Sequence, residues 1–160
     1  MKKDGYSLIE LLVVMAIIAI LAMFGIAAYQ QFNKTQTLRQ AAMTVKNDLR
    51  KAQTRAMASE KPPTSSCTIL DGYQVTFTDS SYQVQAKCSP TSPGVPTSYN
   101  LPTGISFTSY PTKIVFKVLG QGVDITGSNI ICISGFNKLY KITVTTGGEI
   151  KYEENVGSCL

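Results

Sequence analysis

The chain contains no histidine and no tryptophan, and only 16% of its 160 residues are charged. Without histidine it lacks the usual general base and proton shuttle and the commonest metal ligand. It can therefore form no Ser-His or Cys-His nucleophile pair. The sequence also has no G-x-S-x-G, no phosphate-binding loop and no metal-spaced cluster. We therefore expect no enzyme activity and no cofactor.

Charge is also missing from the apolar run between Leu11 and Ala28. About 18 apolar residues are enough for a membrane-spanning helix, and Lys2 and Lys3 before the run place the rest of the chain outside the cytoplasm by the positive-inside rule. A cleaved secretory signal is the alternative, but it requires a clear small-residue cleavage site after the run, which this sequence does not show. Glu10 adjoins the apolar run, where a charge is costly, and is therefore a candidate functional residue.

Beyond this run, apolar residues recur at three- and four-residue steps as far as Ala56. That spacing predicts an amphipathic helix, and Pro62-Pro63 is expected to end it. We predict one rod from about Tyr6 to Ser59, with a transmembrane or assembly part at residues 6–29 and an amphipathic part at residues 30–61. We interpret its basic residues as a solvated face: Lys34, Arg39, Lys46, Arg50, Lys51 and Arg55. The alternatives are contact of Lys34 and Arg39 with lipid headgroups, and contact of Arg50, Lys51 and Arg55 with acidic neighbours in a filament.

Residues 62–160 are rich in Thr, Ser, Gly and Val, which favours a β-rich globular head. Alternating residues at 73–78 and 82–87 predict a hairpin, and Gly147-Gly148 predicts a second hairpin between strands at 139–145 and 149–152. Further strands are expected at 105–107, 113–118 and 129–134. The proline-rich stretch 89–103 is predicted as loop and the glycine-punctuated stretch 120–127 as turn. The fold class is therefore α+β.

All four cysteines lie in this second part of the chain: Cys67, Cys88, Cys132 and Cys159. None belongs to a C-x-x-C pair, which argues against zinc or thioredoxin-like chemistry. An even number in an exported domain predicts two disulfides, with three connectivities open. A bridge between Cys67 and Cys88 would clamp the base of the first hairpin, and Cys132 could tie Cys159 onto the sheet.

The N-terminal segment Lys2-Lys3-Asp4-Gly5, followed by Tyr6-Ser-Leu-Ile-Glu10-Leu-Leu-Val-Val, resembles the class III leader of type IV pilins and pseudopilins. The resemblance implies that residues 1–5 are a leader peptide, that a prepilin peptidase cuts after Gly5, and that the new amine of Tyr6 is methylated. It also implies that Glu10 neutralises the terminal ammonium of a neighbouring subunit during filament assembly. Ala27 stands where many pilins carry a kink-forming proline.

The head resembles the GspH/FimT branch of this family, which contains minor pilins and the H-type minor pseudopilin of type II secretion. The resemblance lies in an ordered series of segments: Val115-Phe-Lys-Val-Leu-Gly-Gln-Gly122, Asn129-Ile-Ile-Cys-Ile-Ser134, Leu139-Tyr-Lys-Ile-Thr-Val144 and Gly147-Gly-Glu-Ile150. It implies a type IV pilin fold, in which a long N-terminal helix packs on a sandwich-like head.

By this resemblance the chain is a structural subunit of a type IV pilus or a type II secretion pseudopilus, located at the filament tip. It would wait in the inner membrane with its head outside the cytoplasm and then move into a cell-surface pilus or a periplasmic pseudopilus. Its implied partners are other pilin or pseudopilin subunits, the prepilin peptidase, the inner-membrane assembly platform and, before assembly, membrane lipid.

A DNA-binding receptor in natural transformation is the alternative function, because some minor pilins of this group bind extracellular DNA. The formal net charge of +5 is compatible with a polyanion partner. Lys138, Lys141 and Lys151 lie in or beside the last predicted hairpin and are the candidate phosphate contacts. Strand alternation does not require these lysines to converge, and neighbouring glutamates would weaken a phosphate site.

Overall fold

The computed structural model describes residues 7–62, 67–89 and 94–159; within this range the side chains of residues 24, 25, 27 and 28 are not described. Two compact units make up the chain, residues 1–36 and residues 37–160. Each is treated by itself below, and residues 37–160 are called the head unit. The predicted cleavage site at Gly5 and Tyr6 lies outside the described residues.

Helix α1 runs without interruption from Leu8 to Met57 and passes through Ala27 as regular α-helix. Its C-terminus is capped before the predicted proline stop. Ser59 adopts a left-handed backbone conformation with φ of 52°, and the Glu60 amide donates to the Arg55 carbonyl at 3.0 Å. This six-to-one hydrogen bond satisfies a carbonyl that the end of the helix would leave unpaired. The predicted rod is confirmed to within two residues at this end.

In the first unit, the large apolar side chains between Leu8 and Met23 are exposed, with exposed fractions from 48% at Val14 to 84% at Leu8. Spanning a bilayer takes about 20 predominantly apolar residues in one helix. Among the residues that the structure describes, no helix is both long enough and apolar enough to cross a membrane. The predicted transmembrane assignment of residues 6–29 is not borne out by this finding.

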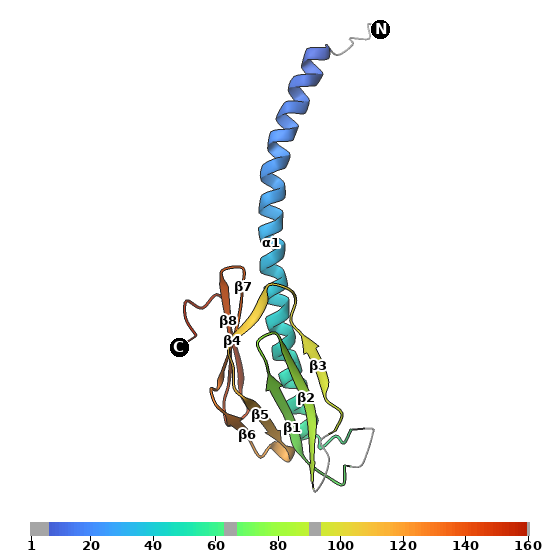
Figure 1. Cartoon of the computed structure of the whole chain (residues 1–160), viewed down its shortest axis with the longest axis vertical. Helices are drawn as coiled ribbons and strands as arrows, with labels where there is room; N and C mark the ends of the chain where they lie inside the picture. Colours follow the sequence, from blue (N-terminus) through green and yellow to red (C-terminus); the bar gives the residue numbers. More distant parts are fainter. Residues whose placement is uncertain (1–6, 63–66, 90–93, 160) are drawn as a thin grey trace. The chain divides into compact units, whose positions relative to one another are not determined.

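Five antiparallel strands of the head unit form one sheet in the order β3-β2-β1-β5-β6. The predicted first hairpin is confirmed as β1 and β2, and β3 lies at the edge of the sheet beside β2 (Figure 1). The bounds of the strands are β1 Ile69–Phe77, β2 Ser81–Ser89, β3 Thr97–Asn100, β5 Lys113–Lys117 and β6 Val123–Thr126.

A second antiparallel sheet has four strands in the order β4-β7-β8-β9. The predicted hairpin around Gly147-Gly148 is confirmed as β8 and β9. A short 3-10 helix, η1 (Val118–Gly120), follows β5. The bounds of the strands are β4 Ile105–Ser109, β7 Ile130–Gly135, β8 Lys138–Val144 and β9 Ile150–Glu153.

Two short strands lie where the sequence predicted none. β3 falls inside the stretch 89–103 predicted as loop, and β6 falls inside the stretch 120–127 predicted as turn. Both are four-residue strands on the edges of the same sheet, and pairing with β2 and β5 holds them in place. Local pattern carries little signal for strands this short, so these two predictions were wrong.

One core joins α1 to both sheets. The helix contributes a stripe of buried residues at three- and four-residue spacing: Leu38, Ala42, Val45, Leu49, Ala52 and Ala56, each at most 1% exposed. The sheets contribute alternating residues such as Val75, Phe116, Ile133 and Ile142. Every described side chain that is buried belongs to the head unit. We therefore expect residues 37–160 to fold on their own.

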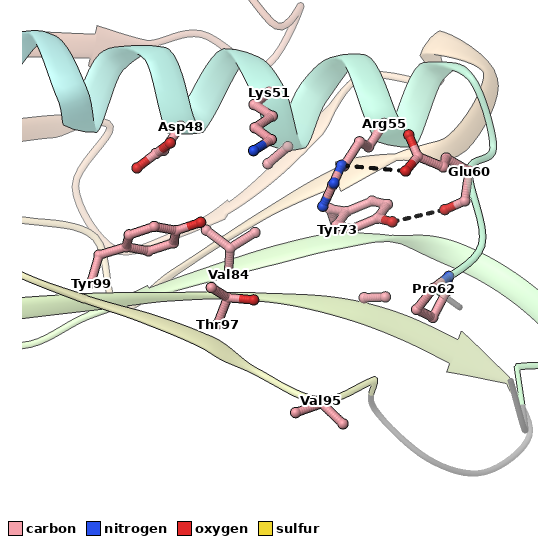
Figure 2. Close-up of a pocket in the computed structure, with 12 residues that line it drawn as sticks. Asp48, Lys51, Arg55, Glu60, Pro62, Tyr73, Val84, Val95, Thr97 and Tyr99 are labelled. Atoms are coloured by element: carbon pink, nitrogen blue, oxygen red, sulfur yellow. Dashed lines mark hydrogen bonds and ion pairs between the residues drawn. The ribbon is translucent and has the colours of Figure 1, made fainter. Parts of the chain in front are cut away.

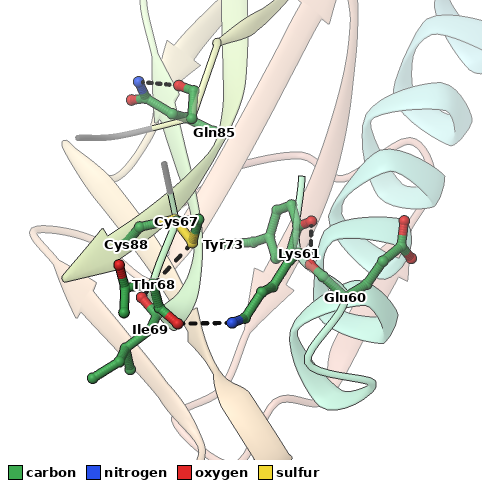
Figure 3. The surroundings of a disulfide bond; sticks show 9 residues. Glu60, Lys61, Cys67, Thr68, Ile69, Tyr73, Gln85 and Cys88 are labelled. Carbon is green, nitrogen blue, oxygen red and sulfur yellow. Dashed lines mark hydrogen bonds between the residues drawn. A yellow bond between two sulfur atoms is a disulfide. The ribbon is translucent and has the colours of Figure 1, made fainter. Parts of the chain in front are cut away.

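Two disulfides close the head unit, and each matches a pairing that the sequence suggested. Cys67 pairs with Cys88 across the base of the β1–β2 hairpin (Figure 3), and Cys132 on β7 pairs with Cys159. In the same region as the first disulfide, Lys61 Nζ donates to the Thr68 carbonyl at 2.7 Å. The segment after α1 is thus fastened to the start of β1.

Candidate assembly site

Glu10 lies in the first turn of α1, which begins where the Leu11 amide donates to the Ser7 carbonyl at 3.2 Å. The partial positive charge of a helix N-terminus stabilises a carboxylate placed there. Together with Leu11, Val14 and Met15, Glu10 lines a hollow of about 470 Å³. Within the described residues it has no ion-pair partner.

The surroundings of Glu10 are apolar on all sides of the helix. Exposed aliphatic residues occur at consecutive positions, so they cannot all lie on one face: Leu8, Ile9, Leu11, Leu12, Val13, Val14 and Met15. A helix that is apolar all round is normally buried, either in a large core or in a membrane. This surface can therefore associate with other apolar surfaces, with Glu10 as its one charged group between residues 8 and 23.

The three candidate DNA-binding lysines are only partly brought together. Lys141 Nζ lies 3.9 Å from Glu153 Oε2 on the neighbouring strand, and Lys151 Nζ lies 3.5 Å from Glu149 Oε2. Lys138 begins β8, opposite Gly135 of β7, and forms no ion pair with any described residue. Two of the three positive charges are therefore already balanced by glutamates.

Strand alternation explains this separation. Tyr140, Ile142 and Val144 are buried in the core, so Lys141 lies on the opposite, outward face of β8. Lys151 lies opposite Thr143 and shares that outward face. Lys138 lies two residues before the buried Tyr140 and therefore on the other face of β8.

A tyrosine–aspartate pair that the sequence analysis missed connects α1 to the first sheet. Tyr82 Oη on β2 donates a hydrogen bond of 2.5 Å to Asp48 Oδ2 on α1, and its ring stacks on Tyr99 with centroids 5.1 Å apart. Burial, together with the hydrogen bond to Asp48, raises the pKa of Tyr82 well above its usual value. The available signal was that Asp48 is the single acid among the basic residues of the amphipathic helix.

Two of the basic helix residues contact residues in or next to β9, and Arg39 remains 44% exposed. Arg39 Nε lies 3.0 Å from Glu154 Oε1, and Lys46 Nζ lies 5.1 Å from the centroid of the Tyr152 ring. Burial and the nearby negative charge of Glu154 raise the pKa of Tyr152. These residues help to hold β9 against α1.

The comparison with protein families singles out the N-terminal segment. Residues 1–26 match the family model of the prokaryotic N-terminal methylation motif, a range that includes Gly5, Tyr6 and Glu10. Searches of curated proteins and of solved structures found no match for this chain. The match covers 26 of the 160 residues, so it shows that the N-terminal segment is similar to that of prokaryotic type IV prepilins.

Proposed function

We propose that the chain is a minor pilin or minor pseudopilin of the GspH/FimT type, a structural subunit at the tip of a type IV pilus or a type II secretion pseudopilus. The observation that carries the proposal is the methylation motif at residues 1–26. The motif implies a membrane-anchored protein that later joins a pilus or pseudopilus. A prepilin peptidase cuts after Gly5 and methylates Tyr6, and the inner-membrane assembly platform then moves the mature subunit into the filament.

The exposed apolar surface of α1 supports a role in assembly. Burial of apolar surface is worth roughly 25 cal/mol per Å², and the aliphatic side chains between Leu8 and Met23 are at least 48% exposed. Other subunits provide the surface that covers them. Glu10 then pairs with the methylated amine of Tyr6 in a neighbouring subunit, because a carboxylate moved into such surroundings needs a cationic partner.

The order of elements in the head supports the narrower assignment to the GspH/FimT type. The four segments on which that resemblance rests form β5 with η1, β7, β8 and the turn into β9, in the same order along the chain. The two-sheet head and its two disulfides are suited to an extracytoplasmic location, where disulfides persist.

Incorporation of Glu10 variants into filaments tests this proposal. In the native host, Glu10→Gln should be cleaved and methylated like the wild type but be absent from sheared filaments, because loss of one partner of a buried ion pair costs about 3–5 kcal/mol. Glu60→Gln is the matched control, since Glu60 is an exposed head residue. Mass spectrometry of the mature chain should find N-methylated Tyr6 as its first residue. Normal incorporation of Glu10→Gln, or an N-terminus other than Tyr6, would refute the proposal.

A DNA-receptor role is the weaker alternative. Its support is the unpaired Lys138 and an excess of basic over acidic residues, 15 against 10 in the whole chain. A gel-shift assay with the head unit should then show salt-dependent binding that Lys138→Ala weakens more than Lys151→Ala, because Lys151 already has a glutamate partner. Equal effects of the two variants, or no binding at low salt, would count against this role.

A further inference from the structure

An elongated groove runs along α1 within the head unit. Two cavities form it, one of about 330 Å³ beside Asp48, Lys51 and Arg55 and one of about 460 Å³ beside Thr37, Gln40, Ala41, Thr44 and Val45. Tyr99 lines both cavities, so they adjoin, and we call them together the β3 groove. Its helical wall extends over residues 37–55, or roughly 27 Å at 1.5 Å per residue.

The floor of the groove is the part of the first sheet that lies beyond α1. Val84 and Ala86 of β2 and Thr97 and Tyr99 of β3 face the groove, and Leu101 and Pro102 close its far end. The floor of the groove is mainly apolar, whereas its helical wall carries charged and polar side chains, and binding sites combine both kinds of group. A groove of this length suits an extended chain of about eight residues at 3.3 Å each better than a compact molecule.

Lys51 gives one end of the groove a cation without an ion-pair partner in the described part of the chain, although the four charges there, those of Asp48, Lys51, Arg55 and Glu60, sum to zero. The two carboxylates there are engaged, Asp48 by the Tyr82 hydroxyl and Glu60 by Arg55, with Nε and Oε1 3.5 Å apart. Lys51 extends from α1 toward the sheet (Figure 2) and forms no ion pair within the described part of the chain. The group that complements the Lys51 ammonium is a carboxylate.

The strand beside the groove offers main-chain hydrogen bonds. β3 pairs with β2 on one side and with no described strand on the other. The Leu101 amide donates to the Ser80 carbonyl, so Leu101 directs its main-chain groups toward β2. In an antiparallel pair every second residue does so, and the main-chain groups of Ser98 and Asn100 therefore point away from β2. No charge or proline interrupts residues 97–100 to protect this edge. An added strand can pair here, with alternate side chains reaching the groove.

We propose that the β3 groove binds an extended peptide segment of a partner protein, one that carries a carboxylate side chain between apolar side chains. Its main chain pairs with the outer edge of β3, its carboxylate binds Lys51, and its apolar side chains cover the floor beside Tyr99. This activity is separate from filament assembly through α1. It makes the head a receptor for a carboxylate-bearing peptide.

Titration of the isotope-labelled head unit with two matched peptides tests the proposal by nuclear magnetic resonance. The probes are acetyl-Leu-Val-Glu-Val-Leu-amide and the same peptide with glutamine in place of glutamate. Both should give saturable shifts at Ser98, Tyr99 and Asn100, and the glutamate peptide should bind about fivefold more tightly, as expected for one exposed ion pair. Equal affinities, shifts confined to other residues, or no saturation would overturn the proposal, as would acetate alone giving the same shifts at the same concentration.

Two variants distinguish the contribution of the Lys51 charge from that of main-chain pairing with the edge of β3. Lys51→Gln should lower the affinity for the glutamate peptide to that for the glutamine peptide, whereas Arg50→Gln, the neighbouring exposed cation outside the groove, should change neither. Ser98→Pro removes an outward amide without touching the pairing with β2, so it should weaken both peptides equally. Loss of binding in Arg50→Gln, or full binding in Ser98→Pro, would contradict the assignment. The head unit lacks Glu10, so failure here leaves the filament proposal untouched.

Discussion

Replacing Tyr82 by phenylalanine should destabilise the head unit through one hydroxyl group. Tyr82 is 2% exposed, and its Oη is the donor that reaches Asp48 Oδ2 from β2 to α1 at 2.5 Å. Phenylalanine retains the ring and its stacking on Tyr99, so no cavity forms. What is lost is a partly buried hydrogen bond to a charged acceptor.

The expected cost is about 1.5–3 kcal/mol of unfolding free energy, the range for hydrogen bonds to charged groups. Asp48→Asn should cost less, because the amide oxygen still accepts from Tyr82. In the double variant the two losses should not add, with a coupling free energy of about 1–2 kcal/mol for groups in direct contact. Tyr110→Phe is the control, since Tyr110 donates to Asp79 at 2.7 Å on the exposed surface, where water replaces the lost partner.

Urea unfolding of the head unit at pH 7, followed by circular dichroism, measures these differences. The order of loss should be Tyr82→Phe first, Asp48→Asn second and Tyr110→Phe last. If Tyr82→Phe cost no more than Tyr110→Phe, or if the Tyr82 and Asp48 effects simply added, the hydrogen bond would not hold α1 against the sheet and the reasoning would be wrong.

Three further predictions concern the same unit. Burial and the hydrogen bond to Asp48 raise the pKa of Tyr82 above 10. The contribution of this tyrosine to the unfolding free energy is therefore complete below pH 10 and declines above it by about 1.4 kcal/mol per pH unit, because only the unfolded chain loses the proton. The unfolding free energy of Tyr82→Phe should accordingly decline less steeply at alkaline pH. Gly72→Ala should lower the free energy of unfolding in urea by about 1–3 kcal/mol, because the added Cβ would overlap the Phe116 carbonyl oxygen. Gly147→Ala is the control and should be nearly neutral, since the atom nearest to its Cβ lies 3.9 Å away. Replacing both Cys67 and Cys88 by serine should lower the unfolding free energy by about 3 kcal/mol for a loop of this length, 21 residues, and an unchanged midpoint would contradict the structural role of that bridge.

Periodic sequence patterns predicted the long elements of this fold well. The stripe from Leu38 to Ala56 predicted the buried face of α1, period-two alternation predicted the first hairpin, and Gly147-Gly148 predicted the second. Cysteine positions flanking those strands were enough to suggest both bridges. Each of these signals is local or repeats along one element, so it can be read without knowing what the element packs against.

Features that depend on distant partners could not be predicted in this way. β3 consists of Thr-Ser-Tyr-Asn between prolines and becomes a strand because β2 supplies its hydrogen bonds. The sequence predicted that glutamates near the last hairpin would weaken a phosphate site there, but not which lysines they would pair with. Lys141 pairs with Glu153 across the strands, and Lys151 pairs with Glu149 two residues earlier. Lys51 and Arg50 are neighbouring cations of the same helix, and the sequence does not distinguish them. The structure does, because Lys51 lines the β3 groove and Arg50 does not.

The order in which the strands enter the two sheets affects how this chain folds. β4 belongs to the four-stranded sheet but lies in the sequence between β3 and β5 of the other sheet. Its partner is β7, so β4 stays unpaired until residues 130–135 are also available to pair. Until then the buried stripe of α1 is only half covered and the newly made chain presents apolar surface. The head therefore becomes stable only after β7 joins β4, and truncation anywhere before β7 is expected to leave no stable head.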